Sequence, residues 1–324
     1  MLFRSIQRRV LTIIGLSISW GFKNEDYKYR RTLLQHISKL RVSLDPEEIM
    51  PSVLARIAHV YIDREQWTEV EVLQVVVMEK RKQVLGDDDP STLFSMQSLA
   101  LTYMEQGRWK EAEALYKAVL EKMKRARERD DHPDTLRSME HLVDTYSRQG
   151  SWKKAEALLV ELLEKRKQVL GDDHRDTLRS MAHLVKIYRN QGSRELADTL
   201  EVEVLEKRRQ TLGDNDEDTF QSMEDVAITY AKQGSWKEAE ALEVEVVAGR
   251  KRVWGDDHPF TLWSMASLVI IYECQGKWKE AEKLAVEVLE KMKRVFGDDH
   301  PDTLRSLETL EYLHWQLGRH QEPT

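Results

Sequence analysis

The chain has 324 residues, with 50 Lys and Arg against 57 Asp and Glu, so its formal net charge is −7. This balance argues against a nucleic-acid binder, because neutralising phosphates requires a basic surface or stripe. A single cysteine, Cys274, excludes an intramolecular disulfide framework, and only 14 Gly and 7 Pro favour helices over a many-stranded sheet.

Residues 1–49 form a segment that precedes a repeated region. Arg4, Arg8 and Arg9 lead into a mostly apolar run at residues 10–22, which resembles a signal peptide but lacks an A-x-A cleavage site. The run is also shorter than the ~20 residues that span a bilayer. We expect the segment to be a helix that caps the apolar edge of the first repeat. The alternative is a membrane-surface helix, in which case residues 10–22 would make the chain a membrane-associated tether.

Near-copies of one sequence unit fill residues 50–318. A Thr that is usually followed by Leu, and a Tyr eleven residues later, recur every 42 residues, with one interval of 43 because of an extra residue near Arg129. The recurring threonines are Thr92, Thr135, Thr177, Thr219, Thr261 and Thr303. The sequence therefore predicts one array of six hairpins rather than two globular domains, since about three repeats already make a stable stack.

Each unit is predicted to contain two helices. In the second unit, Met96, Leu99 and Tyr103 share one face of a first helix that ends near Gly107, and a second helix begins at Trp109. Glycines at the same place should supply a left-handed turn after every first helix. These glycines are Gly107, Gly150, Gly192, Gly234, Gly276 and Gly318.

The boundary between units reads Asp-Asp-His-Pro-Asp-Thr at residues 298–303. We expect Asp302 or Thr303 to cap the next helix. A terminal capping helix is predicted at residues 303–318, followed by a polar tail at 319–324.

In five units an alanine lies nine positions after the recurring tyrosine. A small side chain there lets the second helix approach the first closely, while tyrosine and leucine fill the space between units. One hairpin cannot bury both of its faces, so the units must stack. The predicted fold is an all-α, right-handed α-solenoid (superhelix). The alanines are Ala112, Ala155, Ala197, Ala239 and Ala281.

The aligned residues Leu99, Tyr103, Gly107 and Ala112 match the tetratricopeptide pattern. The 42-residue period, and segments such as GRWKEAEALYKAVLEKMK at 107–124, resemble the tetratricopeptide class of kinesin light chains. They are still more similar to the C-terminal arrays of fungal NOD-like receptor proteins. The resemblance implies a scaffold or adaptor for protein–protein interaction.

Two parts of those families are missing from the sequence. Kinesin light chains carry an asparagine that contacts cargo peptide, but no asparagine occupies the matching positions here. Those positions are Ser98, His141, His183, Asp225, Ser267 and Thr309. The receptors carry a nucleotide-binding domain, whereas this chain has no G-x-x-x-x-G-K-[ST] loop.

Recurring polar residues suggest no chemistry. The histidines beside the aspartates lie one unit apart and do not converge as metal ligands do, and Cys274 has no fixed histidine partner for nucleophilic catalysis. We predict no enzyme activity, no metal site and no cofactor. The recurring histidines are His132, His174, His258 and His300.

Function should therefore depend on the residues that vary on the first helix of each unit, away from the packing stripe. There the middle units are basic and both ends carry apolar side chains. We expect a concave groove that binds a protein or peptide with a central acidic stretch and flanking apolar residues, in the cytoplasm. The groove residues are Phe94, Gln97, Leu101, Arg137, His141, Arg148, Arg179, His183, Lys186, Asn190, Asp225, Lys232 and Trp263, together with Ser98, Asp144, Gln221, Ile228, Ser267 and Ile270.

Overall fold

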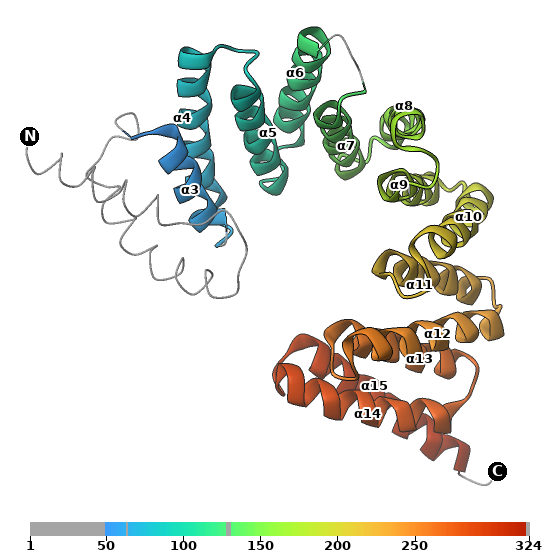
Figure 1. The fold of residues 1–324 in the computed structure, drawn as a ribbon. Coiled ribbons are helices and arrows are strands. Elements are labelled where there is room, and N and C mark those ends of the chain that lie inside the picture. Colours follow the sequence, from blue (N-terminus) through green and yellow to red (C-terminus); the bar gives the residue numbers. More distant parts are fainter. Residues whose placement is uncertain (1–48, 63, 128–130, 322–324) are drawn as a thin grey trace, which may run out of the picture. The chain divides into compact units, whose positions relative to one another are not determined.

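The computed structural model describes residues 49–62, 64–127 and 131–321, which form thirteen α-helices and no strand (Figure 1). Residues 1–48 lie outside the described part of the chain, so the capping helix and the membrane tether at residues 10–22 stay predictions. The chain divides after Lys165 into two compact units.

The first unit contains the helices α3 to α7 and most of α8. They are α3 (Pro51–Ile62), α4 (Trp67–Leu85), α5 (Pro90–Glu105), α6 (Trp109–Arg127), α7 (Pro133–Arg148) and α8 (Trp152–Leu170), whose last residues belong to the second unit. The second unit continues with α9 (Arg175–Gln191), α10 (Arg194–Leu212), α11 (Glu217–Lys232), α12 (Trp236–Trp254), α13 (Pro259–Cys274), α14 (Trp278–Phe296) and α15 (Pro301–Gln321).

Consecutive helices pack against one another from α3 to α7 and from α9 to α15. In chain order α3 to α14 make six hairpins, and α15 follows them. We call the odd-numbered helix of each hairpin helix A and the even-numbered one helix B. The predicted class, an all-α, right-handed α-solenoid of stacked hairpins, is confirmed. None of the described helices is both long and apolar enough to cross a membrane.

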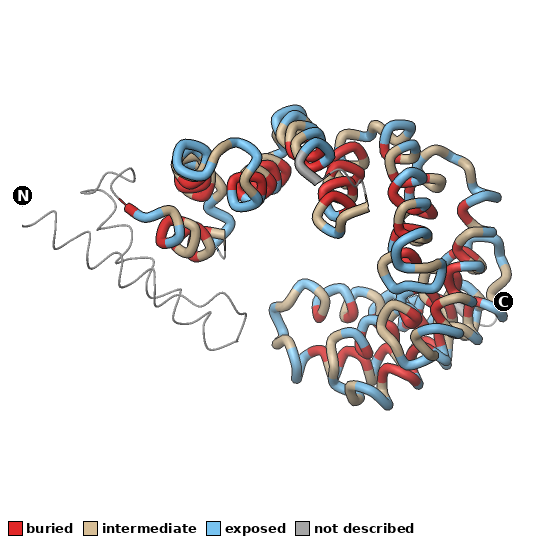
Figure 2. Tube along the Cα trace, turned by 45° about the horizontal axis from the view of Figure 1, so that its top comes forward, coloured by how far each residue is buried: buried red, intermediate tan, exposed pale blue. Residues whose placement is uncertain are grey.

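The core consists of small clusters where neighbouring helices face each other, as the buried residues in Figure 2 show. The five recurring alanines are fully buried, as a close approach of helix B at this position requires. In the last hairpin Ala281 and Ala285 pack with Leu310 and Leu313 of α15. Each hairpin thus completes its core with the helix that follows it.

A glutamine at the end of helix A links successive hairpins. Gln149 donates from Nε2 to the Trp109 carbonyl at 3.0 Å and to Glu113 at 3.0 Å, and Gln275 makes the same pair of bonds to Trp236 and Glu240. Recurring acidic residues near the start of helix B therefore have a structural role in the stack.

The glycine turns after helix A are confirmed at five of the six predicted positions. Gly107, Gly150, Gly192, Gly234 and Gly276 have φ between +69° and +82°. Gly318 was predicted to turn in the same way, and this is wrong: α15 continues through it to Gln321, three residues past the expected end. Residues 319–321, Arg-His-Gln, contain no Gly or Pro that would end a helix, and α15 runs on to Gln321.

The predicted caps at Asp302 and Thr303 are also wrong. The Nδ1 atom of His300 accepts the Asp302 backbone N–H at 3.2 Å, and His132, His174 and His258 cap their helices in the same way. Asp89 and Asp216 do the same with a carboxylate oxygen. The histidine lies one position before the first helical residue, where an acceptor reaches the free N–H groups of the first turn.

One hairpin departs from the shared core. Phe220 of α11 occupies the position of a leucine in the other repeats, and Gly249 of α12 occupies the position of a lysine. A Cβ built on Gly249 would lie 2.4 Å from the Phe220 ring. The larger ring therefore requires a residue without a side chain at position 249. The corresponding residues elsewhere are Leu93, Leu136, Leu178, Leu262 and Leu304 on helix A, and Lys80, Lys122, Lys165, Lys207 and Lys291 on helix B.

This pairing predicts that the effect of one substitution changes sign. Gly249→Ala should lower the free energy of unfolding by ~1 kcal/mol, because overpacking costs ~1–3 kcal/mol whereas alanine gains only ~1 kcal/mol in a helix. In a Phe220→Leu background the same substitution should raise it by up to ~1 kcal/mol. Denaturant unfolding of the four proteins measures both effects. The same sign in both backgrounds would contradict the pairing.

The capping histidines predict that aspartate, but not alanine, can replace them. His174→Ala should lower the free energy of unfolding by ~1 kcal/mol, the typical cost of losing a helix cap. His174→Asp should change it little, since Asp89 and Asp216 fill this place in other repeats. Equal loss in both variants, measured by denaturant unfolding, would show that the Nδ1 bond does not stabilise the helix.

Candidate functional site

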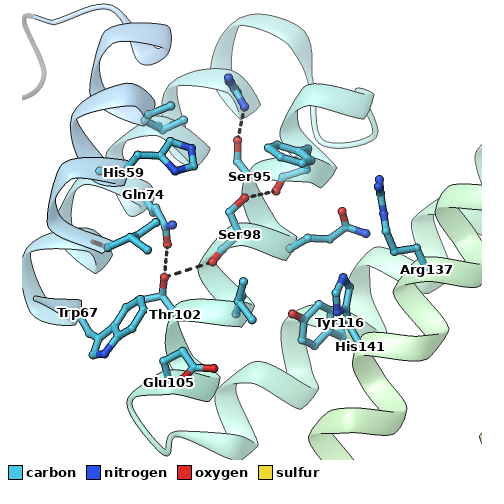
Figure 3. Close-up of a pocket in the computed structure, with 18 residues that line it drawn as sticks. His59, Trp67, Gln74, Ser95, Ser98, Thr102, Glu105, Tyr116, Arg137 and His141 are labelled. Carbon is cyan, nitrogen blue, oxygen red and sulfur yellow. Dashed lines mark hydrogen bonds between the residues drawn. The ribbon is translucent and has the colours of Figure 1, made fainter. Parts of the chain in front are cut away.

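Each unit contains a pocket that opens on the exposed side of its A helices. The pocket of the first unit has a volume of about 490 Å³ and is lined by residues of α3 to α7 (Figure 3). Phe94 and Leu101 of α5 present side chains that are 54% and 46% exposed. We call this the first pocket.

A row of hydrogen-bonded polar side chains forms the inner wall of the first pocket. Thr102 donates to Gln74 Oε1 at 2.7 Å, as Figure 3 shows, and Gln97 donates from Nε2 to Ser138 at 2.5 Å. Gln97 was expected to face the groove as an exposed residue, but it is only 8% exposed. Its amide is held by Ser138 between α5 and α7, so its side chain is part of the wall.

Two rings stack at one end of the first pocket. The His141 ring lies 5.6 Å from that of Tyr116, at an interplanar angle of 21°. Burial lowers the pKa of His141 and raises that of Tyr116, so the imidazole and the phenol are both favoured in their neutral forms. The Tyr116 hydroxyl is buried and has no hydrogen-bond partner in the described structure.

The pocket of the second unit, with a volume of about 660 Å³, lies against α11, α12 and α13. Its rim carries exposed apolar side chains from two A helices, Ile228, Trp263 and Ile270. Trp263 donates from Nε1 to Asp302 at 3.2 Å and contacts Phe260, with 5.4 Å between ring centroids, so the aromatic wall is fixed. We call this the second pocket.

Charged groups lie deeper in the second pocket. Glu243 of α12 is 2% exposed and its Oε1 has no hydrogen-bond partner. Burial, reinforced by the nearby Glu224 carboxylate, raises the pKa of Glu243 to about 8, against the opposing effect of Arg250. Glu243 is therefore mostly protonated at neutral pH.

Arg250, although buried beside the second pocket, is engaged elsewhere. Its guanidinium binds Glu224, donates to Ser264 Oγ at 2.5 Å and binds Glu217 at 2.9 Å. Arg208 makes the equivalent bond to Ser222 one repeat earlier. Arg250 is thus part of a repeated link from helix B to the next helix A, and it gives Glu243 no hydrogen bond.

The predicted basic residues are exposed but several have partners. Arg137 bonds to Asp134 at 3.0 Å and Arg179 to Asp176 at 3.1 Å, each on its own helix. Arg148 pairs with Glu105 at 3.5 Å, and the Asn190 amide donates to the carbonyl of its own helix four residues earlier. A partner carboxylate would therefore have to displace or share these contacts.

The structure places the predicted groove residues in three groups. The first pocket contains Phe94, Gln97, Ser98, Leu101, Arg137 and His141, and the second contains Gln221, Ile228, Lys232, Trp263, Ser267 and Ile270. The remaining ones line neither pocket, and they are Asp144, Arg148, Arg179, His183, Lys186, Asn190 and Asp225. Burial raises the pKa of Asp225, while Lys186 and Arg189 oppose that rise.

Several of the residues that the sequence prediction missed are on helix B. Tyr116, Glu243 and Arg250 reach the pockets from the helix that was expected only to pack. An alignment of the repeats by their 42-residue period would have revealed Glu243. The carboxylate is kept from Glu201 to Glu243, while residues near it change from polar to apolar.

Two features of the described part of the chain bear on the prediction that it has no metal or thiol chemistry. There, no three His, Cys, Asp or Glu side chains converge as metal ligands would. Cys274 is exposed, although its thiol is partly buried. This burial and the nearby Glu273 carboxylate both raise the pKa of the thiol, which disfavours the reactive thiolate.

Comparison with known proteins identifies the repeat. Tetratricopeptide repeat models match residues 50–125, 97–168 and 134–208, and a second model of the same repeat matches 219–260 and 261–302. No curated protein matches the chain.

Several solved structures have similar folds. A putative kinesin light chain from Podosopora anserina, with nearly identical TPR-like repeats, is 27% identical with a TM-score of 0.55, over 63% of this chain and 96% of that one. BtubC from P. vanneervenii is 17% identical with a TM-score of 0.62, over 72% and 94%.

A Pyrococcus horikoshii signal-transduction ATPase with a tetratricopeptide repeat sensor is 15% identical with a TM-score of 0.64, over 98% of this chain and 44% of that one. The similarities to BtubC and to the ATPase show the fold alone. Since the repeat models match well over half of its residues, the chain belongs to the tetratricopeptide repeat family.

Proposed function

We propose that this chain is a protein-interaction scaffold that binds a peptide segment of a partner on the exposed face of its A helices. Tetratricopeptide repeat proteins bind protein or peptide partners, and the repeat fold is generally a non-catalytic scaffold. The observation that carries the proposal is the pair of pockets, one in each unit, with exposed apolar side chains around deeper polar groups.

Exposed aromatic and branched side chains around a concavity are the usual anchors of peptide recognition. Phe94 and Leu101 are exposed apolar side chains of this kind in the first pocket, and Trp263 and Ile270 are their counterparts in the second. Arg179 and Lys186 on α9 add exposed positive charge, which supports the prediction of an acidic stretch in the partner. The relation to fungal NOD-like receptor arrays and the cytoplasmic location stay predictions.

The proposal predicts that apolar truncation in a pocket weakens peptide binding. Peptides selected from a random display library on the whole chain should lose ~10-fold in affinity with Phe94→Ala/Leu101→Ala or with Ile228→Ala/Ile270→Ala, because anchor residues contribute more than ~1 kcal/mol each. Val84→Ala, which removes a side chain 81% exposed on α4 and outside both pockets, is the matched control. A library that yields no binder, or binders indifferent to both pairs, would contradict the proposal.

The acidic preference can be tested separately. Arg137→Ala, Arg179→Ala and Lys186→Ala together should remove the enrichment of Asp and Glu among selected peptides, since charge-assisted hydrogen bonds to carboxylates contribute ~1.5–3 kcal/mol. Sequencing of the selected pools measures the enrichment. The same acidic enrichment in the triple variant would remove these three residues from the binding role and leave the pockets as the site.

A further inference from the structure

The second pocket occupies a place that an arginine side chain fills one repeat earlier. Glu201 of α10 is buried like Glu243, 42 residues before it. There Arg189 bonds to the Glu201 carboxylate, and Thr229 donates to Glu201 Oε2 at 2.7 Å. Both partners come from the neighbouring A helices, α9 and α11.

In the next repeat both partners are lost while the carboxylate remains. Ala231 takes the position of Arg189, and Ile271 takes that of Thr229. Ala231, Ile271 and Glu243 all line the second pocket. A methyl group and a butyl side chain form no hydrogen bond, which explains the unpartnered Oε1 of Glu243.

In two other hairpins this pair of positions is matched. Thr102 donates to Gln74 at 2.7 Å, so a polar group meets a polar one. Ala285 and Leu313 pack together in one apolar cluster. Glu243 opposite Ile271 combines a carboxyl with an apolar residue, and a cavity lies beside them. A buried carboxyl without a partner is costly, so a ligand that satisfies it gains affinity.

We infer that the second pocket binds the guanidinium of an arginine side chain from the partner peptide, which takes the place relative to Glu243 that Arg189 takes relative to Glu201. This inference rests on the proposed function and names the chemistry of one of its contacts. Trp263 and Phe260 add a fixed aromatic wall for a planar cation.

The charges around the pocket agree with a cationic occupant. Glu217 and Glu224 on α11 and Glu243 on α12 contribute three carboxyl groups, and Lys232 on α11 and Arg250 on α12 contribute two cations. Cys274 is the titratable residue that α13 adds. The buried Oε2 of Glu217 also has no partner. The pocket therefore gains a net negative charge when Glu243 ionises.

Binding of a cation should couple to ionisation of Glu243. In the free protein Glu243 keeps its proton until the pH approaches its pKa of about 8. A guanidinium that contacts Glu243 favours the ionised carboxylate instead. Affinity for arginine peptides should therefore rise as the pH increases towards that value. In the unliganded protein, stability should fall across the range from the ordinary pKa of 4.5 to about 8, because the unfolded chain binds fewer protons there.

The test is a synthetic peptide array in which each random sequence occurs twice, with arginine or with neutral citrulline at the central position. On the wild-type chain the arginine members should bind ~10-fold more tightly, as a charge-assisted hydrogen bond implies. Glu243→Gln should bring the ratio of arginine to citrulline affinity close to one. Glu245→Gln, which removes an exposed carboxylate from the same helix outside the pocket, should leave the ratio unchanged.

A second variant places an arginine side chain of the protein itself beside Glu243. Ala231→Arg restores the internal arginine of the preceding repeat, and it should abolish the preference for arginine peptides while it reduces the fall in stability with rising pH. Both this variant and Glu243→Gln should show a flatter profile of thermal unfolding against pH than the wild type. The profile needs no ligand, so it reports on Glu243 even where binding is weak.

Each result decides between the claims. Peptides that bind the wild type with equal affinity for arginine and citrulline members would overturn the guanidinium inference and leave the proposed function intact. The same holds for an arginine preference that survives both Glu243→Gln and Ala231→Arg. An array with no bound member at all would overturn the proposed function itself.

Discussion

Close contact between helices at the fully buried alanine positions is the constraint on which the rest of this structure depends. A residue such as Ala112 or Ala239 has no side chain beyond Cβ, so helix B can lie near the helices beside it. The apolar faces that remain are covered only by the next hairpin, as Ala285 is by Leu313. Stability is therefore shared between neighbours, as expected for a repeat protein.

The same constraint makes single changes in a repeat informative. With the backbone geometry nearly repeated, a substitution at one register alters a defined contact and little else. Phe220 opposite Gly249 is one such change, and the ring fills the space that a side chain would need. Ala231 and Ile271 beside Glu243 are another, and there the lost side chains leave a cavity. The first change preserves packing, whereas the second produces a candidate binding site.

The two pockets differ in their chemistry. In the first, the polar wall is largely satisfied, since Gln74, Gln97 and Thr102 bond to one another or to Ser138. In the second, Glu243 remains buried without a bond at Oε1. An apolar ligand suits the first, and a ligand with a cationic donor suits the second.

The sequence by itself determined the helical hairpins, their number and five of the six predicted glycine turns, because the 42-residue period and the spacing of Leu99 and Tyr103 are local features. It also placed Trp263 and Ile270 on the exposed face of helix A. Only the tertiary structure showed that Gln97 is held in the wall by Ser138 and that His300 caps its helix. These depend on contacts across 41 residues in the first case and on the backbone angle of a turn in the second. The role of Glu243 also needed the structure. Whether a buried carboxyl has a hydrogen-bond partner depends on the side chains of the neighbouring helices, and the sequence of one helix does not show which of them lie beside it.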